Sequence, residues 1–178
     1  PVNPNQVLLS LKKILDSSKI ISEKTVNNYQ QEFRNIAMDI MNARDYEDWQ
    51  EVYKRLVFWE LELENIEDSG LVDIIEQQKK DANSAFFKFI ERTYEDWLHD
   101  DEDAPVLSRN VFKTHVKPLL HKDEKVLLLL IDNLRYDQWK TIEPIFHKYY
   151  NQDKDQLYYS ILPSATQYAR NAFFSGLM

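Results

Sequence analysis

The sequence of 178 residues contains no cysteine, only two glycines and no run of 18 apolar residues. Without cysteine the chain has no disulfide framework and no thiolate metal site. With glycine only at Gly70 and Gly176, a glycine-rich phosphate loop is excluded and long helices are favoured. The lack of a long apolar run and of a signal-peptide pattern predicts a cytoplasmic protein that is not inserted in a membrane.

Negative charge is concentrated in the first part of the chain, within a net charge of −8. Residues 1–105 carry 12 basic and 23 acidic side chains, whereas residues 106–178 carry 10 basic and 7 acidic ones. The simplest interpretation of the first part is a solvated acidic surface. Because such a surface repels the nucleic-acid backbone, direct DNA binding is not expected.

Apolar residues recur at helical spacing through the first 100 residues. Asn3 and Pro4 open a first helix, whose apolar stripe consists of Val7, Leu8, Leu11, Ile14 and Leu15. Further helices are predicted over residues 23–43, from a cap at Asp45 to Leu63, and over 71–98. Their short connections predict an antiparallel bundle with the aromatic residues in its core.

An acidic segment, residues 99–105, follows the bundle and reads as a solvated linker rather than a metal site. Another amphipathic helix is predicted over 108–120. Residues 125–132, KVLLLLID, form a continuous apolar run that ends in a carboxylate, which is typical of a buried parallel strand.

Strand and helix signals alternate after this run. A helix with a kink or break at Pro144 is predicted over 135–150, and a second strand over 157–162. A last helix is predicted over 166–175, ended by Gly176. The predicted fold is therefore an α-helical bundle followed by the start of an α/β domain.

Asp132 and Thr166 are the residues that suggest chemistry. In an α/β sheet, ligands bind beyond the carboxyl ends of the strands, where Asp132 is predicted to lie. Thr166 is predicted to be the N-cap of the last helix, where negative charge is stabilised. A carboxylate and a hydroxyl at one edge suggest metal-assisted chemistry on a phosphate ester. Spacing alone favours a plain cap for Thr166, and Arg135 could either orient Asp132 or pair with Asp137.

The stretch IDNLRYDQWK, followed by YYSILPSATQYARNAFFSGLM, resembles the opening of an alkaline-phosphatase-superfamily domain of the PglZ branch. It is also similar to the output domain of PorX-type response regulators. The resemblance implies Zn²⁺ as cofactor, with Asp132 and Thr166 as metal ligands and Thr166 as the nucleophile. Related phosphodiesterases place an asparagine three residues after the threonine, where this chain has Ala169, so Arg170 and Asn171 are the candidate substrate-binding residues.

The resemblance also implies a domain order. Residues 1–20 would be the last helix of a receiver domain, residues 21–105 a helical-bundle linker, and residues 106–178 the N-terminal part of a PglZ domain. The chain would thus be a fragment, inactive as it stands. The histidines supply no further ligand set; they are His99, His115, His121 and His147.

As a whole, the resemblance implies a two-component response regulator with a phosphodiesterase or phosphatase output for nucleotide-type phosphodiesters, regulating secretion or transcription. A sensor histidine kinase would act through the receiver domain. A second copy of the chain, a sigma factor and a type IX secretion protein are candidate partners. The alternative is a non-catalytic platform for dimerisation and protein docking.

Overall fold

The computed structural model describes residues 4–64, 66, 69–99, 103–121 and 125–177, and it leaves out the side chains of 69, 121 and most of 4–22. The chain divides into two compact units, Pro1–Lys88 and Phe89–Met178. None of the helices in the described ranges combines the length and apolar character needed to span a bilayer.

The first unit is built from α1 (Pro4–Asn42), α2 (Tyr46–Leu63) and most of α3 (Ser69–His99). The prediction of two separate helices before residue 43 is wrong, because α1 is a single helix. Since neither glycine nor proline occurs between residues 5 and 42, nothing in the sequence ends the helix there. Asn3 lies outside the described residues, as do the side chains of the predicted stripe Val7, Leu8, Leu11, Ile14 and Leu15.

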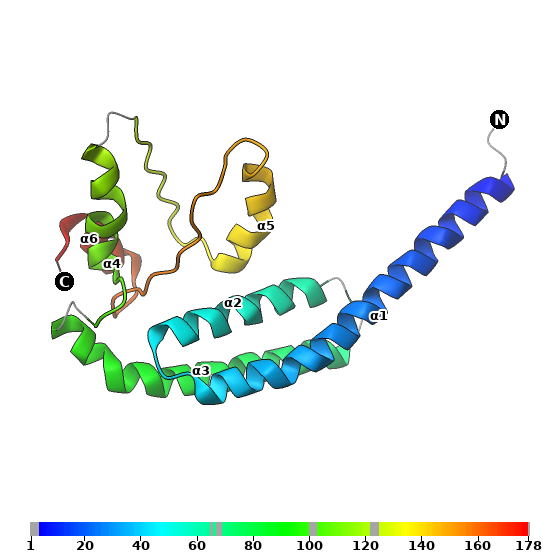
Figure 1. Cartoon of the computed structure of the whole chain (residues 1–178), viewed down its shortest axis with the longest axis horizontal. Coiled ribbons are helices and arrows are strands. Elements are labelled where there is room, and N and C mark those ends of the chain that lie inside the picture. The colour runs from blue at the N-terminus through cyan, green and yellow to red at the C-terminus, as the bar shows by residue number, and fades with distance from the viewer. Residues whose placement is uncertain (1–3, 65, 67–68, 100–102, 122–124, 178) are drawn as a thin grey trace. The chain divides into compact units, whose positions relative to one another are not determined.

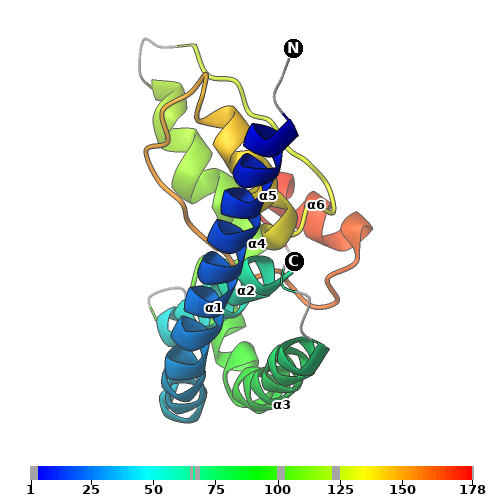
Figure 2. The same cartoon turned by 90° about the vertical axis from the view of Figure 1, so that its right-hand side faces the viewer.

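The predicted helical bundle is confirmed. Asp45 is the N-cap of α2, and its Oδ1 accepts a hydrogen bond from the N–H of Asp48 over 2.9 Å, as predicted. Helix α2 runs back alongside the second half of α1 (Figures 1 and 2). Ring contacts join the helices: Tyr29 of α1 to Trp59 of α2, with centroids 5.4 Å apart, and Trp49 of α2 to Phe86 of α3, 5.3 Å apart.

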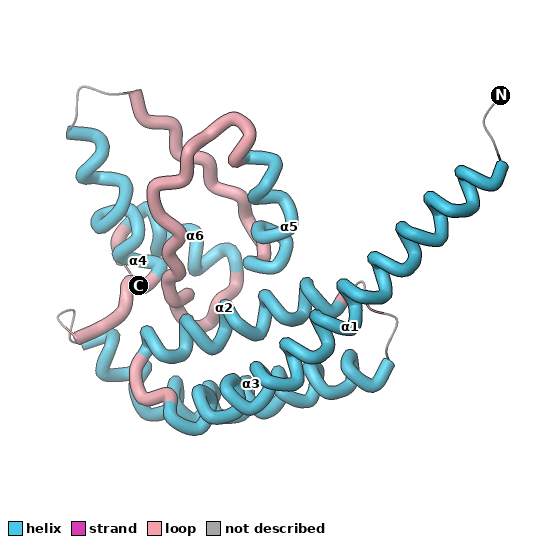
Figure 3. Tube along the Cα trace, turned by 45° about the vertical axis from the view of Figure 1, so that its right-hand side comes forward, coloured by secondary structure: helices cyan, strands magenta, loops and turns pink. Residues whose placement is uncertain are grey.

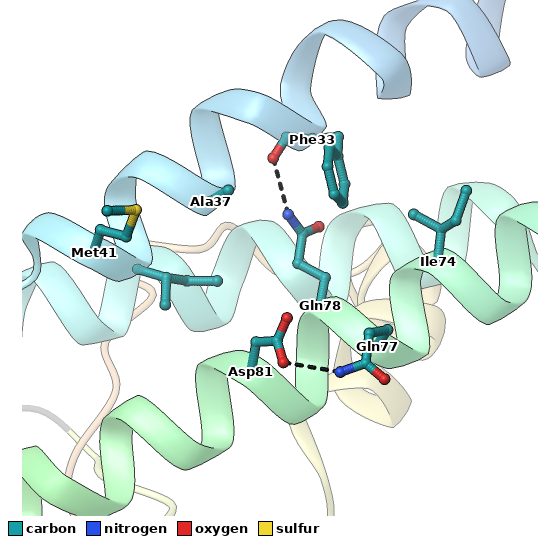
Figure 4. A pocket seen from close by; sticks show the side chains of 8 residues that line it. Phe33, Ala37, Met41, Ile74, Gln77, Gln78 and Asp81 are labelled. Atoms are coloured by element: carbon teal, nitrogen blue, oxygen red, sulfur yellow. Dashed lines mark hydrogen bonds between the residues drawn. The ribbon is translucent and has the colours of Figure 1, made fainter.

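The core of the bundle comes from the predicted stripes. Its buried apolar members include Tyr29, Ile36, Trp49, Val52, Leu56, Trp59, Leu63, Leu71, Ile75 and Ala82. Other members of the stripes stay exposed along a groove of about 350 Å³ between α1 and α3 (Figure 4). Phe33 and Met41 line it from α1, and Ile74 lines it from α3. The groove is mainly apolar, and Asp81 is the carboxylate among its lining residues.

The second unit begins with the last turns of α3. Helical turns then run without a break over α4 (Ser108–Val111), a π-helical turn (Phe112–Val116) and a 3₁₀ turn (Lys117–His121), which confirms the helix predicted over 108–120. Helix α5 spans Tyr136–Phe146 and ends two residues after Pro144, consistent with the predicted break. Helix α6 spans Thr166–Ser175.

The strands predicted over 125–131 and 157–162 do not form. Both segments are drawn as loop in Figure 3, and in the described ranges the only β-type pairing is a parallel bridge between Leu107 and Tyr159. Leu127 is 91% exposed and Leu129 is 66% exposed, so one face of the apolar run is open to solvent, while Val126, Leu128 and Leu130 on the other face are 38–42% exposed. A strand needs a hydrogen-bonding neighbour as well as an apolar sequence, and parallel neighbours come from distant parts of a chain.

Candidate functional site

Asp132 lies in an exposed turn directly after the extended segment 125–131. The next residue, Asn133, has φ 59°, a left-handed conformation that asparagine adopts more readily than most residues. The chain therefore turns sharply after Asp132, and the carboxylate is left facing solvent.

Arg135 forms a fork-like pair with Asp137. Its Nε and Nη2 donate to the two carboxylate oxygens of Asp137 over 3.0 and 2.8 Å. The hydrogen bonds from Arg135 hold the pKa of the Asp137 carboxyl below its usual range. Of the two roles considered for Arg135, the structure therefore records the pairing with Asp137, at the start of α5.

Asp132 is electrostatically coupled to Tyr158. Burial raises the pKa of the Tyr158 phenol, and the negative charge of Asp132 raises it further. Tyr158 lies in the segment that leads to Thr166. The fold thus brings Asp132 near that segment although the two are distant in sequence.

Thr166 is the first residue of α6, and the N-cap is Ala165, with extended backbone angles and no capping hydrogen bond from its side chain. The prediction that Thr166 is the N-cap is therefore wrong by one position. Helix ends are the least predictable part of an element, because the neighbouring residues differ little in local preference. Thr166 is exposed, and its hydroxyl forms no hydrogen bond among the described residues.

The other end of α6 anchors the helix. Ala172 and Phe173 are buried, and the ring of Phe173 lies 6.5 Å from that of Phe112. Gly176 ends the helix in the left-handed region, at φ 69°, and its N–H donates to the carbonyl of Ala172 over 3.0 Å. The predicted helix stop is confirmed, and Thr166 projects from a helix that is fixed at its far end.

Arg170 and Asn171 are both exposed on α6. Residues four apart lie on one face of a helix, so Arg170 shares the face of Thr166 one turn further on. Asn171 is turned away from that face by roughly 140°. Helix geometry therefore favours Arg170 of the two candidates as a neighbour of the Thr166 hydroxyl.

Backbone hydrogen bonds hold the segment before α6. Tyr159 N–H donates to the carbonyl of Val106 over 2.9 Å, and Ser108 N–H donates to the carbonyl of Tyr159 over 3.0 Å. Ile161 N–H donates to Oγ of the buried Ser108 over 3.2 Å. Finally, Leu162 N–H donates to the hydroxyl of Tyr94 over 2.6 Å.

The sequence interpretation had no site role for Ser108 or Tyr94. The partners in these bonds are 53 and 68 residues apart, and no local pattern signals such a contact.

A cluster of charged side chains around Lys140 joins α5 to Asp155, which lies in the loop before the segment 157–162. Lys140 Nζ lies 2.7 Å from Asp155 Oδ2 and 2.9 Å from Glu143 Oε2, and Tyr136 also donates to Asp155. Burial lowers the pKa of Lys140, but the hydrogen bonds to Asp155 and Glu143 outweigh this, and the net pKa is raised. The lysine therefore stays charged, and we assign the cluster to structure rather than to proton transfer.

Zinc can be tested against the ligands at hand. A carboxylate and a hydroxyl are suitable oxygen donors, and Asp132 and Thr166 offer one each. The part of the chain that the structure describes contains no group of three or more His, Asp or Glu side chains that could hold a metal ion. A catalytic zinc takes three protein ligands as a rule. These residues fit part of a zinc site but do not make a whole one.

Comparison with known proteins gives two family matches. Residues 19–98 match the PorX response regulator linker domain, and residues 111–178 match the BREX system PglZ alkaline phosphatase-like domain. No curated protein matches the chain. In this order, the two matched regions correspond to a PorX-type response regulator with a PglZ output domain.

Proposed function

We propose that the phosphatase-like output of this response regulator is a zinc-dependent phosphodiesterase in which Thr166 is the nucleophile. The observation that carries the proposal is the placement of Thr166. It is exposed at the first position of α6, its hydroxyl caps nothing, and it follows the segment with which Asp132 interacts. The PglZ match over residues 111–178 supports the same reaction class.

The chemistry assigns a task to each residue. The Thr166 oxygen would attack phosphorus, the ester oxygen would leave, and water would then release the phosphoryl group from threonine. N–H groups at the start of α6 would stabilise the phosphate oxygens that gain charge, and Arg170 lies one turn further along α6 on the face of Thr166. Asp132 and Thr166 would hold a zinc ion, which when bound lowers the pKa of a coordinated hydroxyl. The remaining ligands would come from the rest of a PglZ domain.

The linker match implies signalling through a kinase partner. Within the proposal, a sensor histidine kinase controls the output in the cytoplasm, the substrates are nucleotide-type phosphodiesters, and secretion or transcription responds. A sigma factor, a type IX secretion protein and a second copy of the chain are the partners that we propose for test.

A docking platform is the rival function. The apolar groove between α1 and α3, with Met41 84% exposed, favours it because apolar surface of this kind commonly marks contacts. The two functions differ in whether Thr166 is needed for a chemical step.

Replacing Thr166 by alanine in the full-length protein separates them. With bis-p-nitrophenyl phosphate and zinc, Thr166→Ala should lower kcat by roughly a thousandfold or more, because a nucleophile is lost. The melting temperature should hardly change, since the Thr166 hydroxyl does not cap α6.

Thr141→Ala is the matched control. It removes a threonine hydroxyl that bonds the Asp137 carbonyl within α5, and it should leave turnover unchanged. Near-normal turnover by a folded Thr166→Ala protein would contradict the enzymatic role and favour the platform.

A further inference from the structure

We propose that Tyr94, on the last turns of the linker helix α3, is a positioning residue for the Thr166 nucleophile; this inference rests on the function proposed above. The Tyr94 hydroxyl accepts a hydrogen bond from Leu162 N–H over 2.6 Å. Leu162 lies four residues before Thr166, whereas Tyr94 falls within the linker match. The Tyr94 side chain of the linker thus contacts the loop that leads into α6, the helix that begins with Thr166.

The hydrogen bond between Leu162 and Tyr94 matters because of its position in the loop. The N–H groups of Tyr159 and Ile161 are bonded to residues 106–108, and the Leu162 N–H follows. Proline has no N–H to donate, so Leu162 carries the last backbone donor before the Pro163 turn. The bond to Tyr94 is therefore the last anchor that the segment makes before that turn.

The ring that carries the hydroxyl is itself held in place. Tyr94 stands edge-on to Trp97 with ring centroids 6.4 Å apart, and Trp97 is only 6% exposed. Trp97 in turn contacts Phe89 at 5.6 Å and Tyr159 at 5.2 Å. Because Tyr159 belongs to the same loop segment as Leu162, α3 holds this segment both through ring packing and through a hydrogen bond.

This arrangement gives the linker a direct influence on the chemistry. A displacement of a reacting group by about 1 Å can slow a reaction by roughly a hundredfold. If the last turns of α3 shift, the bond between Tyr94 and Leu162 lengthens and Thr166 loses its position. Such a shift acts on the chemical step rather than on substrate affinity. The contact is therefore a route by which the state of the linker regulates the output.

The substitution Tyr94→Phe in the full-length protein tests the idea, because it keeps the ring and removes only the acceptor oxygen. We expect kcat for bis-p-nitrophenyl phosphate to fall roughly tenfold, as the loss of one hydrogen bond would give, while KM changes less than about twofold. Tyr149→Phe is the matched control, since Tyr149 is 77% exposed, and it should leave both constants unchanged. A purely structural role would lower the melting temperature and leave kcat per folded molecule unchanged.

Hydrogen exchange gives a readout that does not depend on activity. In Tyr94→Phe the Leu162 amide should exchange roughly tenfold faster than in the wild type, and in Tyr149→Phe at the wild-type rate. Faster exchange together with a lower kcat supports the proposal.

Two results overturn this inference alone: unchanged exchange in Tyr94→Phe, or faster exchange with unchanged kcat in an active protein. Absence of turnover in the wild-type protein overturns the proposed function and this inference together.

Discussion

The hydroxyl of Tyr29 donates a hydrogen bond to Oε1 of Gln78 over 3.3 Å, and both side chains are almost completely buried. Gln78 Nε2 donates in turn to the carbonyl of Phe33 over 2.9 Å. Figure 4 shows the Gln78 amide reaching from α3 toward α1. The Gln78 side chain thus lies within an apolar core with both its amide oxygen and its amide nitrogen hydrogen-bonded. These two bonds fix the position of α3 along α1.

Breaking this pair should destabilise the bundle. Tyr29→Phe leaves the Gln78 oxygen without its donor, and Gln78→Leu leaves the Tyr29 hydroxyl buried without an acceptor. We expect either change to lower the free energy of unfolding by about 1–3 kcal/mol. The double variant should lose less than the sum, because it removes both polar groups.

Urea unfolding of the wild type, Tyr29→Phe, Gln78→Leu and the double variant measures the coupling free energy between the two side chains. Ser84→Ala, which removes an exposed hydroxyl bonded to the Lys80 carbonyl, should change stability by less than about 0.5 kcal/mol. Strict additivity of the two core substitutions would show that the Tyr29–Gln78 bond contributes nothing of its own.

Alkaline pH should weaken the bundle through Tyr29. Burial raises the pKa of Tyr29 from 10.0 to about 12. Between these values the unfolded chain has lost the phenolic proton while the folded chain keeps it, so the free energy of unfolding falls as pH rises. The total loss in the free energy of unfolding should be about 3 kcal/mol.

The measurement is the stability difference between wild type and Tyr29→Phe across this pH window, which removes the contribution of all other titrating groups. The difference should shrink or reverse sign as the pH rises. Parallel curves for the two proteins would contradict the assigned cause.

The 178-residue chain should bind zinc only weakly. The proposed zinc ligands in this chain are only Asp132 and Thr166, whereas a four-coordinate zinc site takes at least three ligands from the protein. Calorimetric titration should show no submicromolar site, and Asp132→Asn should leave the weak binding curve little changed. A stoichiometric submicromolar site, or phosphodiester turnover by this chain, would contradict this prediction and show that the chain supplies more than two zinc ligands.

The two parts of the chain should differ in self-sufficiency. A fragment of residues 21–100 retains the matched stripes of α1, α2 and α3 and should unfold cooperatively on heating, as followed by circular dichroism. A fragment of residues 106–178 lacks Tyr94 and Trp97, so Leu162 and Tyr159 lose their partners. We expect no cooperative transition for it. A sharp transition in the second fragment would contradict this dependence on α3.

Features set by neighbouring residues were predictable from the sequence. The Asp45 cap needs only the N–H of Asp48, three residues on, and the stop at Gly176 needs only a residue that tolerates positive φ. The core stripes follow from helical period alone. The continuity of α1 was not predicted, because the predicted apolar stripe is interrupted between Leu15 and Val26, and such an interruption resembles the gap between two helices.

Features set by distant contacts were not predictable. The segment 125–131 has the composition of a strand, but strand pairing depends on residues elsewhere in the chain. The bond between Tyr94 and Leu162 joins residues 68 positions apart, and neither carries a local mark. The site residues Asp132, Thr166, Arg170 and Asn171 stay predictions. The predicted domain boundaries of the chain, between residues 20 and 21 and between residues 105 and 106, also stay predictions. The first of these boundaries falls inside α1.

The exposure of the apolar run at residues 126–131 has a consequence for synthesis of the chain. Residues 126–131 are six consecutive aliphatic side chains, all at least 38% exposed. On a ribosome they emerge before any later part of a sheet can cover them, which makes them a site for aggregation or chaperone binding. Lys125 and Asp132 place one charge at each end of the run, the arrangement by which gatekeeper residues limit strand-to-strand association. Asp132, the carboxylate proposed to hold zinc, would thus first limit the association of one nascent chain with another.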